Sequence, residues 1–201
     1  MLQQSLTLAI LFADISGSTS LYETLGDEDA HKLVSTCIHE LSGVVADHRG
    51  TVIKTIGDGV MCTFPAADKA IEAATAMQES MDSLSLSPPG KHVKVNIRIR
   101  IHWGPVIRQN YDVFGDAVNV AARMVSLAKS RQILTTKQTV DVLPEGFAVN
   151  IRRVDRRTIK GKAGEVTVFE IVWEEKDQTI VISNDPTIPV IYTRLHLKMG
   201  E

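Results

Sequence analysis

The stretch TVIKTIGDGVMCTF, residues 51–64, decides how this chain can fold. β-Branched and apolar residues flank a tip made of Gly57, Asp58 and Gly59, a composition typical of a β-hairpin. Two strands joined this tightly run antiparallel. The stretch therefore argues against a sheet in which parallel strands alternate with helices, and against the phospho-acceptor signalling domains that are built on such a sheet.

The segments on either side of this hairpin alternate between helical and extended patterns. Their order, β-α-ββ-α-β-α-β followed by more strands, predicts an α+β fold with helices on one face of a mainly antiparallel sheet. The predicted strands are 6–13, 51–56, 60–64, 93–103, 133–135, 147–153 and 166–173, and the predicted helices are 27–48, 65–81 and 116–129.

Composition narrows the class of protein. The chain has 201 residues, 44% hydrophobic and 23% charged, as expected of one globular domain or of one domain and a tail. A formal net charge of -2 gives no sign of nucleic-acid binding. Two cysteines, Cys37 and Cys62, are too few for a disulfide framework, so we expect a reducing, cytoplasmic setting. We expect no membrane segment in this chain, because no apolar run is long enough to span a bilayer.

Two aspartates occupy places that suit a hard cation. Asp14 follows the buried strand 6–13, and Asp58 lies at the hairpin tip. Taken singly, Asp14 is more typical of a helix N-cap and Asp58 of a turn, but Mg²⁺ binds one or two such carboxylates together with phosphate oxygens. The turn after Asp14 can present backbone N–H groups to a phosphate at a helix start. That turn consists of Ser16, Gly17, Ser18 and Thr19.

A second polar set lies on the helix predicted for 116–129. Asn119 and Arg123 are four residues apart, so their side chains lie side by side on the helix. Taken alone, the pair is typical of a solvated flank. We predict that both point away from the core face of that helix, which consists of Val118, Ala121, Ala122 and Val125.

Three segments together resemble the class III adenylyl and guanylyl cyclase catalytic domain. FADISGST (residues 12–19) is similar to the first metal motif of that family, KTIGDG (54–59) to the second and DVFGDAVNVAAR (112–123) to the third. A weaker fourth match is IKGK at 159–162. The resemblance covers roughly residues 6–173 in the family's order, and implies the ferredoxin-like cyclase fold.

The resemblance also implies an activity and a role for each motif residue. The activity is adenylate cyclase, a lyase that converts ATP to cyclic AMP and pyrophosphate with two divalent metal ions, Mg²⁺ or Mn²⁺. The implied metal ligands are Asp14 and Asp58, the purine contacts Lys54 and Asp112, the ribose contact Asn119, the transition-state residue Arg123 and the terminal-phosphate contact Lys160.

Side-chain chemistry supports the choice of purine. Adenine offers an acceptor at N1 and a donor at N6, and guanine inverts both. Lys54 can only donate, and an ionised Asp112 can only accept. The pair therefore matches adenine and mismatches guanine twice, which favours ATP over GTP.

In the family, two protomers share each active site. The resemblance therefore implies a homodimer with shared sites. In each site Asp14 and Asp58 come from one protomer, and the other protomer supplies Lys54, Asp112, Asn119 and Arg123. The segment between Pro105 and Asp112 is shorter than in many family members, and this segment often forms the dimer arm.

Two other functions stay open at this point. One is a catalytically silent nucleotide-binding regulatory module on the same fold, although such modules usually lose a metal aspartate or the transition-state pair, and this chain has neither loss. The other is a guanylate cyclase, which is disfavoured because Lys54 and Asp112 mismatch guanine.

The sequence changes character near its end. We expect the cyclase domain to span residues 1–175, and residues 176–201 to form a linker and the start of a further β-rich module. The reason is a charged and turn-rich stretch followed by alternating residues at 195–199.

Overall fold

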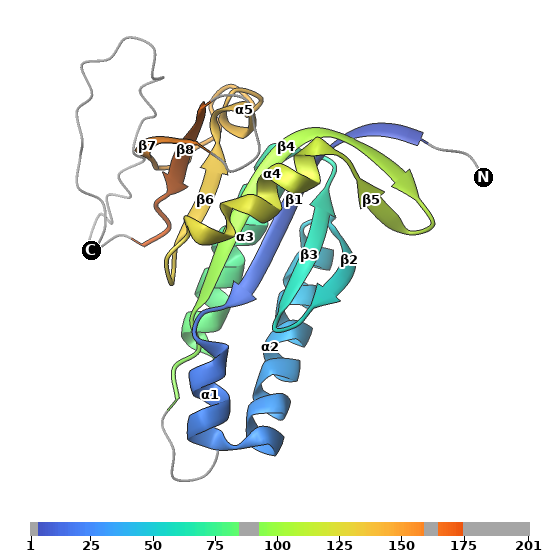
Figure 1. Cartoon of the computed structure of the whole chain (residues 1–201). Helices are drawn as coiled ribbons and strands as arrows, with labels where there is room; N and C mark the ends of the chain where they lie inside the picture. Colours follow the sequence, from blue (N-terminus) through green and yellow to red (C-terminus); the bar gives the residue numbers. More distant parts are fainter. Residues whose placement is uncertain (1–3, 85–92, 159–164, 175–201) are drawn as a thin grey trace, which may run out of the picture.

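A single sheet of eight strands organises the molecule (Figure 1). The computed structural model describes residues 4–84, 93–158 and 165–174. Its strands are β1 (Gln4–Ile15), β2 (Thr51–Ile56), β3 (Gly59–Phe64), β4 (Ile97–Gln109), β5 (Asp112–Phe114), β6 (Ile133–Thr136), β7 (Ile151–Thr158) and β8 (Glu165–Ile171). Its helices are α1 (Ser18–Leu25), α2 (Asp27–Asp47), α3 (Ala67–Ser83), α4 (Asp116–Arg123), the 3₁₀ turn η1 (Met124–Ser126) and α5 (Lys137–Val140).

The strand order confirms the predicted fold class. Along the sheet the order is β2-β3-β1-β4-β6-β8-β7, with β5 paired to β4 outside this path. Every pairing is antiparallel except that of β4 with β6. The elements β1, α2, β2, β3, α3 and β4 form a ferredoxin-like β-α-β-β-α-β unit, and β1 is its central strand.

The helices α2 and α3 cover one face of the sheet. Their apolar residues recur every three or four positions and pack against alternate residues of β1, β3 and β4. Both cysteines lie in this core as free thiols. Burial raises the pKa of Cys37 to about 11 and that of Cys62 to about 12.

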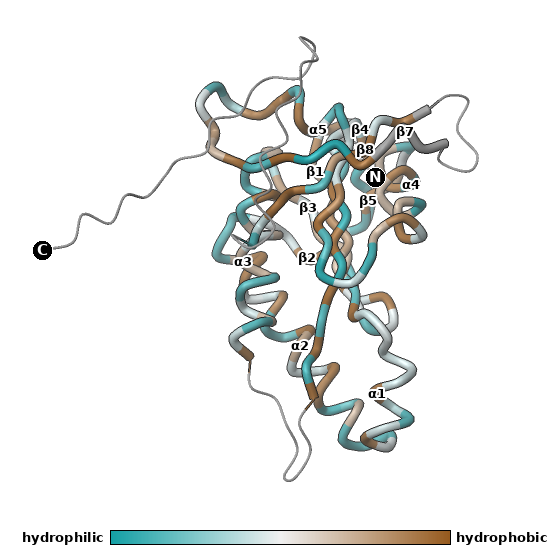
Figure 2. Tube along the Cα trace, turned by 90° about the vertical axis from the view of Figure 1, so that its left-hand side faces the viewer, coloured by the Kyte–Doolittle hydropathy of each residue, from teal (hydrophilic) through white to brown (hydrophobic). Residues whose placement is uncertain are grey.

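The other face of the sheet is also covered, which corrects the prediction that all helices lie on one face. α4 packs there, with Ala117 and Ala121 against Ile10 of β1 and Met61 of β3. The nearly edge-on view in Figure 2 places α3 and α4 on opposite sides of the strands. This second layer also explains why β4 is not half-exposed as predicted, because Arg100 and His102 on its polar face are buried.

The apolar face of α4 was predicted in the wrong place. The buried residues are Ala117, Val120, Ala121 and Met124, whereas Val125 is exposed. The helix also ends at Arg123 and continues only as the turn η1. The sequence between 116 and 129 fits two overlapping apolar stripes, and the position of the sheet selects between them.

Other elements differ from the prediction at their ends or were not predicted. The structure adds the short elements α1, β5 and α5, and it moves β4 from 93–103 to Ile97–Gln109 and β7 from 147–153 to Ile151–Thr158. The tail predicted for 176–201 lies outside the described residues. Within the described ranges, no helix combines the length and the apolarity that crossing a bilayer requires.

We predict that Gly59→Ala destabilises the protein by about 1–3 kcal/mol, the usual range for overpacking. Gly59 pairs with Asp14 across β1 and β3, and an added Cβ would meet the Asp14 Cβ at 2.8 Å and also the Ala13 carbonyl oxygen. Chemical denaturation measures the change. Gly43→Ala is the control: nothing lies within 4 Å of its Cβ on α2, so we expect a gain of about 0.5–1 kcal/mol. Equal stability of Gly59→Ala and the unmodified protein would contradict the close approach.

Candidate functional site

The two candidate metal ligands lie side by side at one end of the sheet. Asp14 lies in β1, one residue before its end, and pairs with Gly59, the residue after Asp58. The Ile15 N–H donates to the Asp58 carbonyl oxygen at 3.4 Å, so the two backbones are in contact. Both aspartates are half-buried. The strand-end and hairpin-tip placements predicted for Asp14 and Asp58 therefore hold to within one residue.

Two arginines of β4 contact Asp14, and the sequence reasoning missed both. The Arg98 Nε donates to Asp14 Oδ1 at 2.7 Å, and the Arg100 Nη1 donates to Oδ2 at 3.2 Å. Alternation along β4 shows that the two arginines share a face. It does not show that this face looks toward Asp14, because that depends on the pairing of β4 with β1.

The two arginines differ in their surroundings. The hydrogen bond to Asp14 raises the pKa of Arg98, whereas burial lowers the pKa of Arg100. Asp58 is close enough to act electrostatically on both guanidinium groups. The site therefore holds two carboxylates and two cations, with a formal sum of zero.

The run from Ser16 to Thr19 forms the entry to α1. Gly17 has a left-handed φ of 73°, and Ser18 and Thr19 lie in the first turn of the helix, where N–H groups have no partner within the helix. The Ser16 N–H is already used, because it donates to the Asn96 carbonyl at 2.8 Å. Three of the four predicted phosphate contacts thus lie at a helix N-terminus beside Asp14.

The residues around Asp14 fit a divalent cation bound together with a phosphate. Within the described part of the chain, the buried side-chain atoms that lack a hydrogen-bond partner are Ser16 Oγ, two residues after Asp14 in the chain, and the Nε of Arg100, whose Nη1 contacts Asp14. Among those same residues there is no group of three or more metal-ligating side chains. Two carboxylates without further protein ligands match Mg²⁺, which completes its coordination with water and phosphate oxygens.

The predicted purine pair is brought together at a different place. The Lys54 Nζ on β2 donates to Asp112 Oδ2 on β5 at 2.6 Å, and the Val113 N–H donates to Asp112 Oδ1 at 2.8 Å. These contacts lower the pKa of Asp112, chiefly through the bond from Lys54. Lys54 precedes Asp58 by four residues, so their Cα atoms lie at most about 13 Å apart, the span of an extended chain at about 3.3 Å per residue.

Asn119 and Arg123 are the remaining predicted site residues that the structure describes, and we group them with Lys54 and Asp112. Both are exposed on α4, four residues apart and off its buried face, as predicted. α4 follows β5 directly, so these side chains belong to the Lys54–Asp112 side of the molecule. Lys160 lies outside the described residues.

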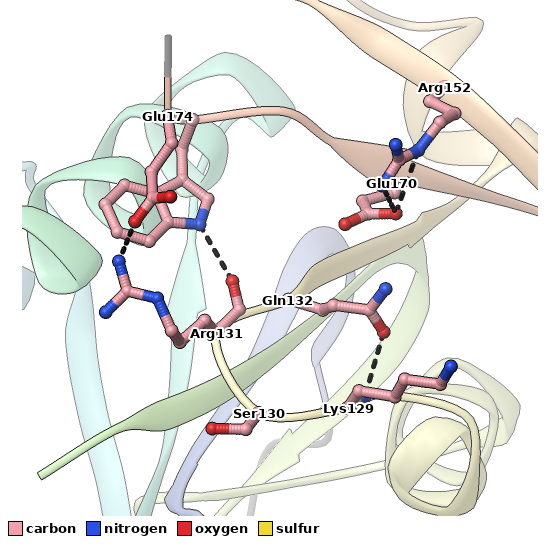
Figure 3. Close-up of a pocket in the computed structure, with 8 residues that line it drawn as sticks. Lys129, Ser130, Arg131, Gln132, Arg152, Glu170 and Glu174 are labelled. Carbon is pink, nitrogen blue, oxygen red and sulfur yellow. Dashed lines mark hydrogen bonds and ion pairs between the residues drawn. The ribbon is translucent and has the colours of Figure 1, made fainter. Parts of the chain in front are cut away.

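A pocket of about 270 Å³ lies away from both groups, beside the loop between η1 and β6 (Figure 3). Arg131 stacks on the Trp173 ring at 4.9 Å, and the Trp173 Nε1 donates to the Arg131 carbonyl at 2.8 Å. Arg131 also binds both oxygens of Asp82 on α3 at 2.6 and 2.8 Å. This cluster ties α3 to the sheet.

Comparisons with known proteins identify a family that matches most of this chain. A family model described as "Adenylate and Guanylate cyclase catalytic domain" matches residues 2–172. "Adenylate cyclase, terminal-differentiation specific" of Dictyostelium discoideum is 30% identical over 195 residues, which cover 88% of this chain and 9% of that protein. The chain spans less than half the length of the curated relatives.

Two solved structures share the fold over most of their length. The adenylyl cyclase CyaB from P. aeruginosa has a TM-score of 0.76 at 26% identity and covers 86% of this chain and 96% of its own. The guanylyl cyclase Cya2 has a TM-score of 0.74 at 25% identity and covers 85% and 94%.

We predict that Asp82→Asn destabilises the protein at pH 7 by about 1 kcal/mol, a value limited by solvent screening of a pair that is a third exposed. Arg131, with Lys94, holds the pKa of Asp82 well below its usual value. A lowered pKa in the folded state contributes stability above about pH 4, which is lost as the pH falls. The deficit of the variant should therefore shrink below pH 4.

Urea denaturation at pH 7 and pH 3 measures this effect. Asp112→Asn is the matched control, because its exposed partner Lys54 makes one contact only, and we expect a change of at most about 0.5 kcal/mol. If the two variants lose the same stability, the Asp82 cluster has no special structural role.

Proposed function

The chain belongs to the adenylate and guanylate cyclase catalytic domain family, and on that basis we propose that it is an adenylate cyclase, which converts ATP to 3′,5′-cyclic AMP and pyrophosphate. The observation that carries the choice of substrate is the contact between Lys54 and Asp112. In this contact a side chain that can only donate lies 2.6 Å from one that can only accept, and this supports the proposal that the pair binds the purine.

The purine proposal rests on hydrogen-bond polarity. Asp112 is ionised at neutral pH, as an aspartate ordinarily is, and Lys54 lowers its pKa further, so it can only accept. Opening the Lys54–Asp112 contact leaves one donor for adenine N1 and one acceptor for the adenine amino group. Guanine would meet a donor with a donor and an acceptor with an acceptor, and unpaired polar groups of this kind reject the wrong ligand strongly.

At the other end of the sheet, Asp14 and Asp58 would hold two divalent cations, Mg²⁺ or Mn²⁺. When bound, these ions supply acidity to the ribose 3′-hydroxyl and charge neutralisation to the phosphates. The amides of Gly17, Ser18 and Thr19 would bind phosphate oxygens at the positive end of α1.

The reaction itself is an internal phosphoryl transfer. The ribose 3′-oxygen forms a bond to the α-phosphorus, the bond from the α-phosphorus to the bridging oxygen breaks, and pyrophosphate leaves. Asn119 would orient the ribose for this attack. Arg123 would neutralise the negative charge that grows on the α-phosphoryl oxygens.

One protomer holds these two groups of residues apart, and this supports a shared site. The exposed Arg123 and Asn119 and the Lys54–Asp112 pair lie on the surface of β2, β5 and α4. A two-fold axis that brings this surface onto the Asp14 end of a second protomer creates two equivalent sites. Exposed apolar residues near the β2 and β5 tips, Ile56, Ile107, Tyr111 and Phe114, are available for such an interface.

The direct test is an assay of the purified protein with ATP or GTP and with Mg²⁺ or Mn²⁺, scored for both cyclic nucleotides. We predict cyclic AMP from ATP, and a loss of at least about 100-fold in kcat for Asp14→Asn and for Asp58→Asn, since each removes a metal-binding carboxylate. Circular dichroism checks that both variants fold. Cyclic GMP formed from GTP, with no cyclic AMP formed from ATP, would identify a guanylate cyclase, and no turnover with either nucleotide would favour a silent nucleotide-binding module.

We predict that Lys54→Glu combined with Asp112→Cys lowers kcat/KM for ATP and raises the ratio of GTP to ATP use by at least about tenfold, because the donor and acceptor change. The control is the same double exchange at Lys137 and Asp141, an exposed pair on and next to α5 with the same 2.6 Å contact. The control should leave the ratio unchanged. An unchanged ratio in the Lys54 and Asp112 variant would mean that these side chains do not select the base.

A further inference from the structure

Arg100 is a buried cation with few partners. Its side chain is 4% exposed, and its Nη1 makes a hydrogen bond of 3.2 Å to Asp14. Its Nε is buried and has no hydrogen-bond partner among the described residues, and its guanidinium lies 5.9 Å from the centre of the Phe12 ring. Burying a charge with so few partners is unfavourable, because these contacts replace only part of its lost hydration.

Packing alone does not account for an arginine at this position. The register neighbours of Arg100 are Phe12 on β1 and Leu134 on β6, both apolar. An apolar side chain of similar length would fill the same space without an unpaired donor, and such replacements of buried charges are often neutral or stabilising. The contact that an apolar residue cannot make is the one to Asp14.

Arg98 and Arg100 differ in how freely they can leave Asp14. The Arg98 side chain is 34% exposed, so it can turn into solvent when another cation approaches. Arg100 is enclosed between the sheet and the layer formed by α4 and η1, and it stays beside the carboxylate. A metal ion at Asp14 must therefore bind next to a fixed positive charge.

This charge has a consequence for the order of binding. The site holds two carboxylates and two guanidinium groups, so a bare divalent cation meets no net negative charge. A nucleotide triphosphate brings its own negative charges and restores the attraction. The cation and the nucleotide should therefore bind far more tightly together than the cation binds alone.

We propose that Arg100 is a positioning residue that holds Asp14 in the metal-free site and makes divalent-cation binding depend on the nucleotide. The inference rests on the proposed role of Asp14 as a metal ligand. In this arrangement the protein captures the metal complex of ATP and binds free metal ions weakly.

The test measures Mn²⁺ binding directly by electron paramagnetic resonance, without nucleotide and with α,β-methylene-ATP, whose α–β bridge cannot be cleaved. Without nucleotide, Arg100→Met should bind Mn²⁺ at least about tenfold more tightly than the unmodified protein, because the variant lacks a positive charge that contacts the proposed metal ligand Asp14. The gain in Mn²⁺ affinity on adding the analogue should fall by a similar factor. Arg100→Lys keeps the charge and should stay close to the unmodified protein.

Arg49→Met is the matched control, because it removes the same charge at an exposed position near the far end of the sheet. It should leave both Mn²⁺ affinities unchanged. Thermal unfolding verifies each variant, and Arg100→Gln replaces Arg100→Met if the latter does not fold.

The outcomes separate this inference from the proposed function. If Asp14→Asn abolishes Mn²⁺ binding but Arg100→Met binds it as the unmodified protein does, the coupling role of Arg100 is wrong while the metal site stands. If Asp14→Asn leaves Mn²⁺ binding intact, the metal assignment fails and this inference fails with it. Tighter binding in Arg49→Met as well would reduce the effect to overall charge and would also overturn the inference.

Discussion

The register of β1 between β3 and β4 is the constraint on which the site depends. β1 pairs antiparallel with both neighbours, and this pairing places Asp14 opposite Gly59 on one side and opposite Arg98 on the other. Side chains alternate across a strand, so a slip of one residue would turn Asp14 into the apolar core beneath α2 and α3. Burying the Asp14 carboxylate in that core without a partner would be unfavourable, and this cost opposes such a slip.

The helix α4, which covers the second face of the sheet, determines which residues of the proposed site are exposed. α4 packs over the face of the sheet that carries Asp14, and its small residues Ala117 and Ala121 let it lie close to β1 and β4. Asn119 and Arg123 consequently lie on the exposed side of α4. The same layer encloses Arg100, so the packing that presents one half of the proposed site also fixes the charge at the other half.

Local patterns predicted much of this arrangement. The hairpin around Asp58 and the long helix α2 depend on neighbouring residues alone, and both formed within a residue or two of the expected bounds. The family resemblance assigned Lys54 and Asp112 to one purine site, and the structure brings these two side chains, 58 residues apart in the sequence, into contact. Contacts between segments far apart in the sequence could not be predicted. The buried face of α4 depends on the sheet beneath it, and the contact of Arg100 with Asp14 depends on the pairing of β4 with β1. The tail from 176 and the contact proposed for Lys160 stay predictions.

The central claim is that each active site combines two protomers, and mixing two inactive variants tests it most directly. Asp58→Ala removes a proposed metal ligand from one half of the site, and Arg123→Ala removes the proposed transition-state residue from the other. In a mixed dimer, one site carries both lesions and the other carries none. With free exchange, about half the dimers are mixed, so cyclic AMP synthesis should return to about a quarter of the unmodified rate if sites act independently. No recovery, while labelled subunits demonstrably exchange, would contradict the shared site.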